Sequence, residues 1–391
     1  MSDGTPCLRP LVVTHNYPTP ELPNFGAFVE ALVRQWTRAG TETCVIAPNP
    51  YFSLHTKRFT RPGPDSSAQG EPTVLRPGHL TFSNRVVGPI RTARLSLAAF
   101  RRSVLRAARR IPFGPDVVYA HFLFPSGHTG LELAERLGVP AVVAVGESGF
   151  SLYEETLGRA RVEATARRFD GIVSVSQGNR DWVVERYGVD PERVVVVPNA
   201  TDTEHFRPRD RAALREELGL PRDRVLVGFS GHFDERKGPL RVMEAIRELP
   251  EVGAVFLGSG AQQPSGEQVL VARRVPNAEV ARYMAATDVY VLPTLNEGSP
   301  NAVIEAMACG LPIVSSDIPS LRETVPPEAA HLVDPRDIDA LRGAIRTLVD
   351  DAGLRERMGA AARAHAERSS IAARADRIRS FLCQVVERGR R

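Results

Sequence analysis

Short apolar runs alternate with longer amphipathic stretches along most of the chain. In the first half the apolar runs lie at residues 10–15, 43–48, 116–122, 140–146, 171–176 and 193–199. The stretches between them repeat apolar residues at helical spacing, as at 26–38, 129–137, 157–169 and 179–187. Alternating strand-like and helical segments are typical of parallel α/β sheets. The pattern therefore predicts a doubly wound, Rossmann-like domain over residues 1–198.

A polar segment at residues 200–223 interrupts this pattern, which then restarts. Further apolar runs lie at residues 224–231, 253–260, 269–275, 288–293 and 312–317. A chain of 391 residues exceeds the size at which a single core usually stops growing. We therefore expect a second Rossmann-like domain at 199–371, and a final helix at about 372–391 that packs back on the first domain. Two such domains place a ligand in the cleft between them.

Residues 91–110 form a basic segment with seven arginines and no acidic residue. Leu97, Phe100, Val104 and Leu105 recur there at roughly helical spacing, so we expect an amphipathic helix. Its apolar face is expected to cover the first sheet, because a doubly wound sheet needs a helix on each face. The alternative is a helix that lies on an anionic membrane surface. Residues 51–79 read as a long polar loop over the same domain.

Net charge, apolar runs and cysteine content limit the classes of binding partner and the cellular compartment that we expect. The formal net charge of +4 is too small to indicate a nucleic-acid partner. No apolar run approaches the ~20 residues that span a bilayer, and no charged start with an apolar signal segment follows Met1. We therefore expect a cytoplasmic protein, with peripheral contact with the inner face of the membrane as the one alternative. The four cysteines form no CxxC pair, so neither a disulfide framework nor a zinc site is indicated.

The stretch NEGSPNAVIEAMACG contains a helix start that suits an anion. Ser299 is a good N-cap residue, and Pro300 suits the first helical position. The amides of Asn301, Ala302 and Val303 would then point out of the helix end, where the helix dipole favours negative charge. We expect a phosphate group to bind here.

A second loop, SGHFDERKG, follows the apolar run at 224–231 and precedes another predicted helix. The ammonium group of Lys237 in this loop could pair with a diphosphate. The other interpretation is an ordinary solvated lysine. Neither loop matches the P-loop pattern, because GxxxxGK followed by Ser or Thr does not occur in the chain.

Two glutamates, Glu297 and Glu305, lie around the predicted phosphate-binding helix start. If a nucleoside diphosphate-sugar binds, their carboxylates can accept hydrogen bonds from the hydroxyls of the two sugar rings. Alternatively, Glu297 only interacts with the helix dipole and Glu305 lies on a solvated helix face. The spacing of the two residues does not decide between these interpretations.

The stretch EGSPNAVIEAMACGLPIVSSD is similar to the signature of the retaining family-4 glycosyltransferases, which have the GT-B fold. It keeps both glutamates, the glycine after the first, and the continuation EAMACGxPIV. Supporting matches are spread along the chain: NFGAFVEALV, VSVSQGNRDWV, VVPNATDTEHF, the KG of ERKG, and ATDVYVLPT. The resemblance implies an α/β fold of two Rossmann-like, doubly wound domains that face each other across a cleft.

The resemblance also implies a role for individual residues. Glu305 would bind the ribose hydroxyls, Glu297 the donor sugar and Lys237 the diphosphate, with Glu297, Lys237 and His232 as the catalytic set. Gly26 would begin a loop that closes over the donor, where only glycine permits close backbone approach; a simple turn glycine is the alternative. The implied donor site comprises Gly26, Gly231, Lys237, Glu297, Gly298, Ser299, Pro300, Asn301, Ala302, Val303 and Glu305.

Two positions depart from the family pattern. His232 stands where many relatives have an arginine, and an imidazole gives weaker help to a leaving diphosphate than a guanidinium. Val145 stands where many relatives have a histidine. The residues after it, Gly146, Glu147 and Ser148, are candidates for cleft or acceptor contacts, as is His121 at another strand end. The alternative is that His121, as a lone histidine, is a core residue or supports the site from behind.

The chain is therefore expected to be a retaining glycosyltransferase of the hexosyltransferase type. It would move a sugar from a nucleoside-diphosphate-sugar, such as a UDP-sugar, to a hydroxyl of an acceptor sugar, lipid-linked sugar or small molecule. No DxD motif stands at a strand end, so we expect no metal and no further cofactor. The alternatives are a sugar-nucleotide epimerase or a phosphorylase on the same fold, and a non-catalytic subunit that only binds the sugar nucleotide.

Overall fold

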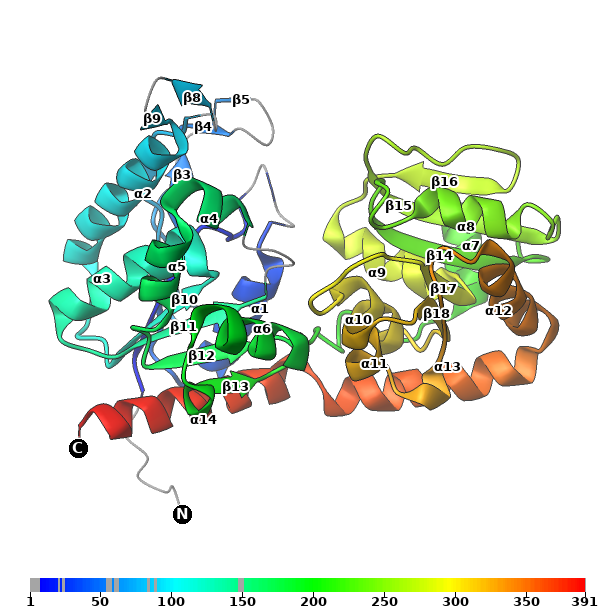
Figure 1. Cartoon of the computed structure of the whole chain (residues 1–391). Coiled ribbons are helices and arrows are strands. Elements are labelled where there is room, and N and C mark those ends of the chain that lie inside the picture. Colours follow the sequence, from blue (N-terminus) through cyan, green and yellow to red (C-terminus); the bar gives the residue numbers. More distant parts are fainter. Residues whose placement is uncertain are drawn as a thin grey trace, which may run out of the picture. The chain divides into compact units, whose positions relative to one another are not determined.

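The computed structural model describes residues 8–19, 22, 25–53, 58–59, 63–82, 85–87, 90–146 and 151–390. The chain divides into two compact units, each built around one parallel sheet (Figure 1). The N-terminal unit comprises Met1–Val197 and Ala375–Arg391, and the C-terminal unit comprises Pro198–Arg374. The boundaries expected from the sequence lay at 198/199 and at about 372.

The sheet of the N-terminal unit has seven strands in the order β13-β12-β11-β10-β1-β2-β6. All neighbouring pairs are parallel, and Leu11 in the centre pairs with Val118 on one side and Cys44 on the other. The central strands are buried along their whole length because helices cover both faces. The strands are β1 (Pro10–Thr14), β2 (Cys44–Ile46), β6 (Thr73–Leu75), β10 (Val117–His121), β11 (Ala141–Val145), β12 (Gly171–Ser174) and β13 (Val194–Val196).

Helices cover both faces of this sheet. On one face, Phe100 and Val104 of α2 share a core cluster with Leu131 of α3. On the other face, the Trp36 ring of α1 packs 5.5 Å from that of Tyr119, and its Nε1 donates a 2.9 Å hydrogen bond to the backbone oxygen of Ala375 in α14. The helices are α1 (Ala27–Arg38), α2 (Ala93–Ala107), η1 (Ala108–Arg110), η2 (Leu123–Gly127), α3 (His128–Leu137), α4 (Ser151–Leu157), α5 (Arg159–Ala166), α6 (Gln177–Tyr187) and η3 (Pro191–Arg193).

One expectation for this unit was incomplete and another was wrong. The helix predicted around residues 157–169 corresponds to α5, and Gly158, with a φ of 87°, separates it from α4, a preceding helix that was not predicted. The stretch at 51–79 is not only a loop: it contains β6, the edge strand of the main sheet. A strand of three residues is too short to stand out by alternation of apolar and polar positions. The short strands of this region are β3 (Asn49–Pro50), β4 (Phe52–Ser53), β5 (Arg58–Phe59), β7 (Gly78–His79), β8 (Val86–Val87) and β9 (Ile90–Arg91).

The sheet of the C-terminal unit has six parallel strands in the order β16-β15-β14-β17-β18-β19. Its last strand was not predicted from the sequence. The strands are β14 (Val225–His232), β15 (Val252–Ser259), β16 (Val269–Arg273), β17 (Val289–Leu292), β18 (Ile313–Ser316) and β19 (Ala330–Val333). The helices are α7 (Arg211–Leu218), α8 (Pro239–Ile246), α9 (Asn277–Ala286), α10 (Asn301–Ala308), α11 (Pro319–Thr324), η4 (Pro327–Ala329), α12 (Ile338–Asp350), α13 (Ala352–Arg368) and α14 (Ile371–Gly389).

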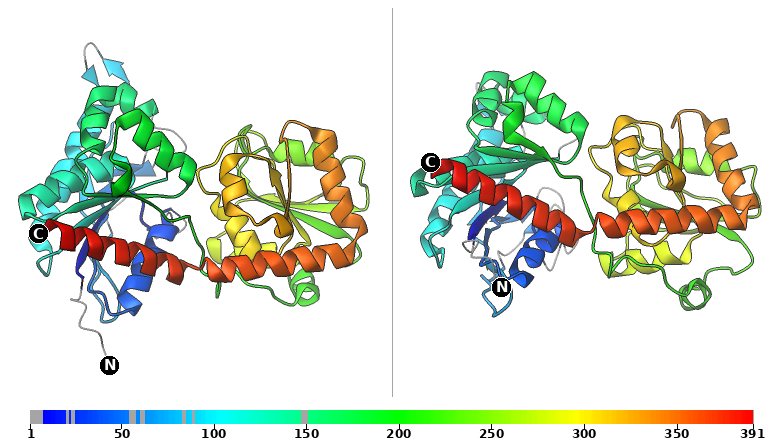
Figure 2. Two further views of the ribbon diagram at one scale, coloured as in Figure 1. Left: turned by 60° about the horizontal axis from the view of Figure 1, so that its bottom comes forward. Right: turned by 90° about the horizontal axis from the view of Figure 1, so that it is seen from below.

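The C-terminal helix α14 crosses from one unit to the other at Ala375. Its later residues, red in Figure 2, lie along the N-terminal unit. Phe381 and Val385 pack so closely on Gly171 of β12 that a Cβ there would lie 2.8 Å from the Phe381 ring. Glycine at this point of the strand therefore makes room for the helix.

Strands β14 and β17 are neighbours in the C-terminal sheet, and each leads into a loop and then a helix. The loop after β14 leads to α8, and the loop after β17 leads to α10. Parallel strands end at the same edge of a sheet, so the two loops with candidate chemistry meet there.

Candidate functional site

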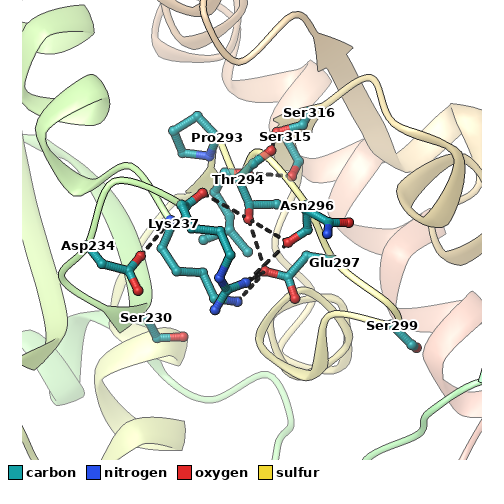
Figure 3. A network of polar contacts seen from close by, with 12 residues as sticks. Ser230, Asp234, Lys237, Pro293, Thr294, Asn296, Glu297, Ser299, Ser315 and Ser316 are labelled. Atoms are coloured by element: carbon teal, nitrogen blue, oxygen red, sulfur yellow. Dashed lines mark hydrogen bonds and ion pairs between the residues drawn. The ribbon is translucent and has the colours of Figure 1, made fainter. Parts of the chain in front are cut away.

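Several polar side chains at this edge contact the same carboxylate oxygen, Oε1 of Glu297. Oε1 of Glu297 contacts the Nζ of Lys237, accepts a 2.9 Å hydrogen bond from the Nη1 of Arg236, and accepts another of 3.0 Å from the Oγ1 of Thr294 (Figure 3). The side chains of Glu297 and Lys237 are only 11% and 13% exposed. Two cations therefore share one half-buried carboxylate oxygen, so the cluster keeps a positive charge.

The loop after β14 holds Lys237 in place through its own backbone. The Oδ1 of Asp234 accepts a 2.8 Å hydrogen bond from the Lys237 amide, and Gly238, at φ 74°, forms the N-cap of α8. The neighbouring strand lies very close, because a Cβ on Gly258 would fall 1.8 Å from the carbonyl oxygen of Gly231. The loop is thus fixed before any ligand binds.

The start of α10 differs from the prediction in two details. Pro300, not Ser299, is the N-cap residue, and no side chain caps the helix. The amide of Val303 is not free, because it donates a 3.1 Å hydrogen bond to the carbonyl of Pro300. The amides of Asn301 and Ala302 form no hydrogen bond within the part of the chain that is described. Two backbone donors, rather than three, are available to an anion.

Ser299 has a different task from the one expected. Its Oγ accepts a 3.2 Å hydrogen bond from the amide of Asn199, and its carbonyl accepts one of 3.1 Å from the Asn199 side chain. Because a serine hydroxyl that accepts from another segment is turned away from its own helix, the N-cap geometry is lost. Ser299 thereby ties the loop before α10 to the segment that follows β13.

Glu305 lies just over one turn into α10, and its carboxyl makes no hydrogen bond or ion pair with any described residue. Burial raises the pKa of its carboxyl from 4.5 to about 8, although the nearby Lys237 lowers it. The neutral acid, rather than the expected carboxylate, is therefore favoured at neutral pH without a ligand. A neutral acid can both donate and accept hydrogen bonds, which suits a pair of hydroxyls.

The polar side chains of the strands behind this cluster form hydrogen bonds with neighbouring strand and loop residues. The Tyr290 hydroxyl lies 3.0 Å from the Oγ of Ser230, and burial raises the pKa of Tyr290 well above its ordinary value. The Oγ of Ser316 donates a 2.6 Å hydrogen bond to the carbonyl of Thr294. These contacts hold the loop ends in position beneath Glu297.

The remaining predicted residues belong to other segments of the fold. His232 ends β14 with an exposed side chain, and Gly26, His121 and Gly146 belong to the N-terminal unit. Gly26 has a φ of 75°, and a Cβ there would lie 2.3 Å from the backbone of Asn16, so only glycine fits. His121 is 4% exposed and packs against the Phe28 ring at 5.1 Å. Glu147 and Ser148 lie outside the described residues.

Comparison with known proteins identifies the family. Residues 26–205 match Glycosyltransferase Family 4, and residues 210–365 match the glycosyl transferases group 1. A D-inositol 3-phosphate glycosyltransferase of Xylanimonas cellulosilytica is 33% identical over 304 residues, which cover 70% of this chain and 73% of that protein. The chain belongs to the family-4 glycosyltransferases.

Solved structures establish the fold of this glycosyltransferase as GT-B. Sucrose-phosphate synthase from Thermosynechococcus elongatus has a TM-score of 0.76 and 21% identity, covering 96% of this chain and 98% of that one. HepE from Anabaena in complex with UDP-glucose has a TM-score of 0.69 and 17% identity, covering 95% of this chain and 99% of that one. The fold predicted from the signature of the second domain is thus confirmed.

Sequence reasoning missed three contributors to the site of this glycosyltransferase: Arg236, Thr294 and Asn199. Arg236 directly precedes Lys237, and its charge was a signal that could have been used. Lys237 also stands out by composition, because the chain has only one other lysine, Lys57, among its 50 basic residues. Thr294 and Asn199 carry no such signal, since each matters only through a contact with a distant segment.

Among the described residues, no helix is long and apolar enough to cross a membrane. Within the same part of the chain, no group of three or more His, Cys, Asp and Glu side chains is arranged to hold a metal ion.

Proposed function

We propose that this glycosyltransferase takes its sugar from a nucleoside-diphosphate-sugar, with UDP-sugars as the first class to test, and transfers it with retention to an acceptor hydroxyl without a divalent metal. The observation that carries the proposal is the shared carboxylate: Lys237 and Arg236 both contact Oε1 of Glu297, three residues before Pro300, the N-cap of α10. A diphosphate is the anion that can replace Glu297 as the partner of both cations.

Donor binding then exchanges partners within the cluster. The diphosphate takes over Lys237, Arg236 and the two unpaired amides at the start of α10. Glu297 is released and becomes an acceptor for hydroxyls of the donor sugar, while Glu305 contacts the ribose. This explains why two acidic residues lie beside a phosphate site: one of them occupies the cations until the donor arrives.

The same groups assist the reaction. The bond between the anomeric carbon and the diphosphate oxygen breaks, and a bond from the anomeric carbon to the acceptor oxygen forms on the same face of the sugar. The acceptor proton passes to an oxygen of the departing diphosphate. Lys237, Arg236 and the amides stabilise the charge that grows on the leaving group, and they are already in place before the reaction.

Calorimetry with UDP and UDP-glucose in excess EDTA tests donor binding and metal independence together. We expect binding to the wild type and a loss of about 1.5–3 kcal/mol in donor binding for Glu305→Ala. The exposed Glu251→Ala is the control for a lost glutamate in the same unit. Transfer that stops in EDTA and returns only with Mg²⁺ or Mn²⁺ would contradict the metal-free mechanism.

The alternatives differ in their products. The anomeric configuration of the product, measured by NMR, distinguishes retention from inversion. An epimerase would convert the donor sugar without transfer, a phosphorylase would need inorganic phosphate, and a non-catalytic subunit would bind the donor without hydrolysis or transfer. Release of UDP together with a glycosylated acceptor supports the transferase.

The outer face of α2 supports a second element of the proposal, peripheral contact with an anionic membrane. The apolar side of α2 covers the sheet, as expected, but its outer side lines a groove of about 700 Å³. Arg102, Arg106 and Arg109 in this groove form no ion pair with any described residue, whereas Arg101 pairs with Glu132. Each unpaired arginine contributes about 1 kcal/mol near an anionic lipid surface.

Liposome co-sedimentation tests this contact. The triple variant Arg102→Glu, Arg106→Glu, Arg109→Glu is expected to lose binding to anionic vesicles. A second triple variant, with the exposed Arg207, Arg274 and Arg388 changed to Glu, has the same net charge and is expected to bind. Equal binding of both variants, or no pelleting of the wild type at low salt, would show that α2 does not dock on the membrane.

A further inference from the structure

Contacts on both sides of its glycine hold the loop before α10. On one side, Glu297 belongs to the cluster of cations described above. On the other side, Ser299 accepts two hydrogen bonds from Asn199. The amides of Asn301 and Ala302, which form no hydrogen bond within the described part of the chain, follow two and three residues after Ser299. The position of Ser299 therefore affects where these two amides point.

Asn199 grips Ser299 at two different atoms. The backbone N–H of Asn199 donates a 3.2 Å hydrogen bond to the Oγ of Ser299, and the side-chain Nδ2 donates one of 3.1 Å to the Ser299 carbonyl. The Ser299 side chain points away from the Glu297 cluster (Figure 3). Because hydrogen bonds are directional, two of them to one residue fix its orientation as well as its position.

The chain between Ser299 and the two amides is stiff. The next residue is Pro300, whose ring holds its φ near the observed −77°. A residue that precedes a proline is itself restricted to extended conformations, so Ser299 has little freedom either. A displacement of Ser299 is therefore passed on to the amides of Asn301 and Ala302 and is not absorbed by the backbone between them.

The segment that carries Asn199 is anchored to the start of α14. The carbonyl of Pro198 accepts a hydrogen bond from the Nη1 of Arg374, whose side chain is buried. The carbonyl of Thr201 accepts another, of 3.0 Å, from the amide of Ile371. These partners lie outside the cluster that the diphosphate is proposed to enter, so a donor molecule can bind without displacing them.

Donor binding affects the two sides of the loop differently. In the exchange proposed above, the diphosphate replaces Glu297 as the partner of Lys237 and Arg236, so the contacts on that side of the loop are lost. The contact between Asn199 and Ser299 involves none of the exchanged groups. It persists while charge grows on the leaving group, when the donors to that charge must already be in place.

We propose that Asn199 is a positioning residue for the diphosphate. By holding Ser299, it keeps the amides of Asn301 and Ala302 directed at the phosphate groups after Glu297 has been released, and it does not itself touch the donor. The proposal rests on the donor binding proposed above and assigns that site a residue from a distant segment of the chain.

Calorimetry with UDP and with uridine tests this role on the full chain. Asn199→Ala removes the side-chain donor to the Ser299 carbonyl, and the affinity for UDP should fall about three- to tenfold. Uridine has no phosphate, so it should bind the variant and the wild type alike. Ser299→Ala removes the other hydrogen bond and should show the same pattern, whereas Ser299→Thr keeps the hydroxyl and should retain most of the UDP affinity.

Gln268→Ala is the matched control in the same unit. The Nε2 of Gln268 also donates to backbone carbonyls, at the end of α8 and the start of β15: Ile246, Leu249 and Val252. Its loss should lower Tm but leave the ratio of UDP affinity to uridine affinity unchanged. Because the amides also stabilise the leaving group, kcat at saturating donor should fall in Asn199→Ala and not in Gln268→Ala.

An equal loss of UDP and uridine affinity in Asn199→Ala would show that Asn199 only supports the fold, and would overturn the positioning role. Unchanged UDP affinity in both Asn199→Ala and Ser299→Ala would overturn it as well. Should Asn199→Ala not fold, the comparison of Ser299→Ala with Ser299→Thr decides. Absence of UDP binding to the wild type is a different result, because it contradicts the proposed donor site itself.

Discussion

The carboxyl edges of the two sheets differ in how they partner their cationic side chains when no ligand is bound. In the C-terminal unit, Glu297 contacts Lys237, Arg236 and Thr294, so both cations have an internal partner before a ligand arrives. In the N-terminal unit, the Nη1 of Arg76 is buried and has no hydrogen-bond partner among the described residues. At the C-terminal edge a ligand must replace Glu297 as the partner of the cations. At the N-terminal edge the Arg76 guanidinium has no such internal partner to replace among the described residues.

This difference has a physical consequence for binding. In the C-terminal site each cation has an anionic partner both before and after the ligand binds, so the unliganded site is stable. The ligand must displace Glu297, which lowers its affinity. An open cation destabilises the unliganded fold but gains its full interaction on binding. Substitutions at the two edges should therefore differ in how much they change the free energy of unfolding relative to the free energy of ligand binding.

The largest contrast is expected between a paired and an unpaired buried cation. Arg215 is 5% exposed and pairs with the buried Asp288, which also accepts the Leu226 amide at 2.7 Å. Arg215→Met should destabilise the fold by about 3–5 kcal/mol, because it leaves that carboxylate short of a partner. Arg76→Met should not lower the stability, because it removes a buried nitrogen that has no partner among the described residues. Calorimetric unfolding of both variants checks this, and an equal loss in the two would erase the contrast.

Loss of the central cation comes next. Lys237→Ala should lower kcat about 10²–10³-fold, since it removes one donor to the leaving group, and Lys237→Arg should lower it less. Steady-state kinetics with saturating donor measure the effect, with Arg247→Ala as the control. A rate within twofold of the wild type for Lys237→Ala would remove Lys237 from the mechanism.

Protonation of Glu305 gives the C-terminal unit a pH-dependent stability. Its carboxyl has a pKa of about 8 in the fold against 4.5 unfolded, so the native state holds a proton that the unfolded state releases in this window. This contribution to stability is complete below pH 4.5 and is lost as the pH rises through 8. Glu305→Gln should abolish the corresponding fall in Tm, about 3–6 °C between pH 5 and 9. Parallel Tm profiles for variant and wild type would contradict a buried, protonated Glu305.

The smallest expected effect concerns the competition at Glu297. Glu297→Gln frees Lys237 and Arg236, so UDP should bind about three- to tenfold more tightly, while turnover falls because the donor sugar loses an acceptor. Isothermal titration with UDP and a transfer assay measure the two effects. Weaker UDP binding in Glu297→Gln would mean that the carboxylate does not compete with the diphosphate.

The predictable parts of the molecule follow from local patterns. The long buried strands, such as β10 and β14, and the helices α1 and α3 end within a residue or two of their predicted limits, because apolar periodicity is a local signal. Edge strands β6 and β19 were missed, since three or four residues give too few periods. The glutamates and Lys237 were found from the sequence, whereas Thr294 and Asn199 were not, because their partners come from other segments.

The sequence by itself determined the fold class, the glycosyltransferase family and the residues of the donor signature, because strand periodicity and a contiguous motif are written along the chain. Only the tertiary structure decided how those residues are used: that Lys237 and Glu297 contact each other, that burial raises the pKa of Glu305, and that Ser299 binds Asn199 rather than caps α10. Partner choice and pKa depend on which groups the fold brings within a few ångströms and how far it excludes water, and neither quantity is a property of spacing along the chain.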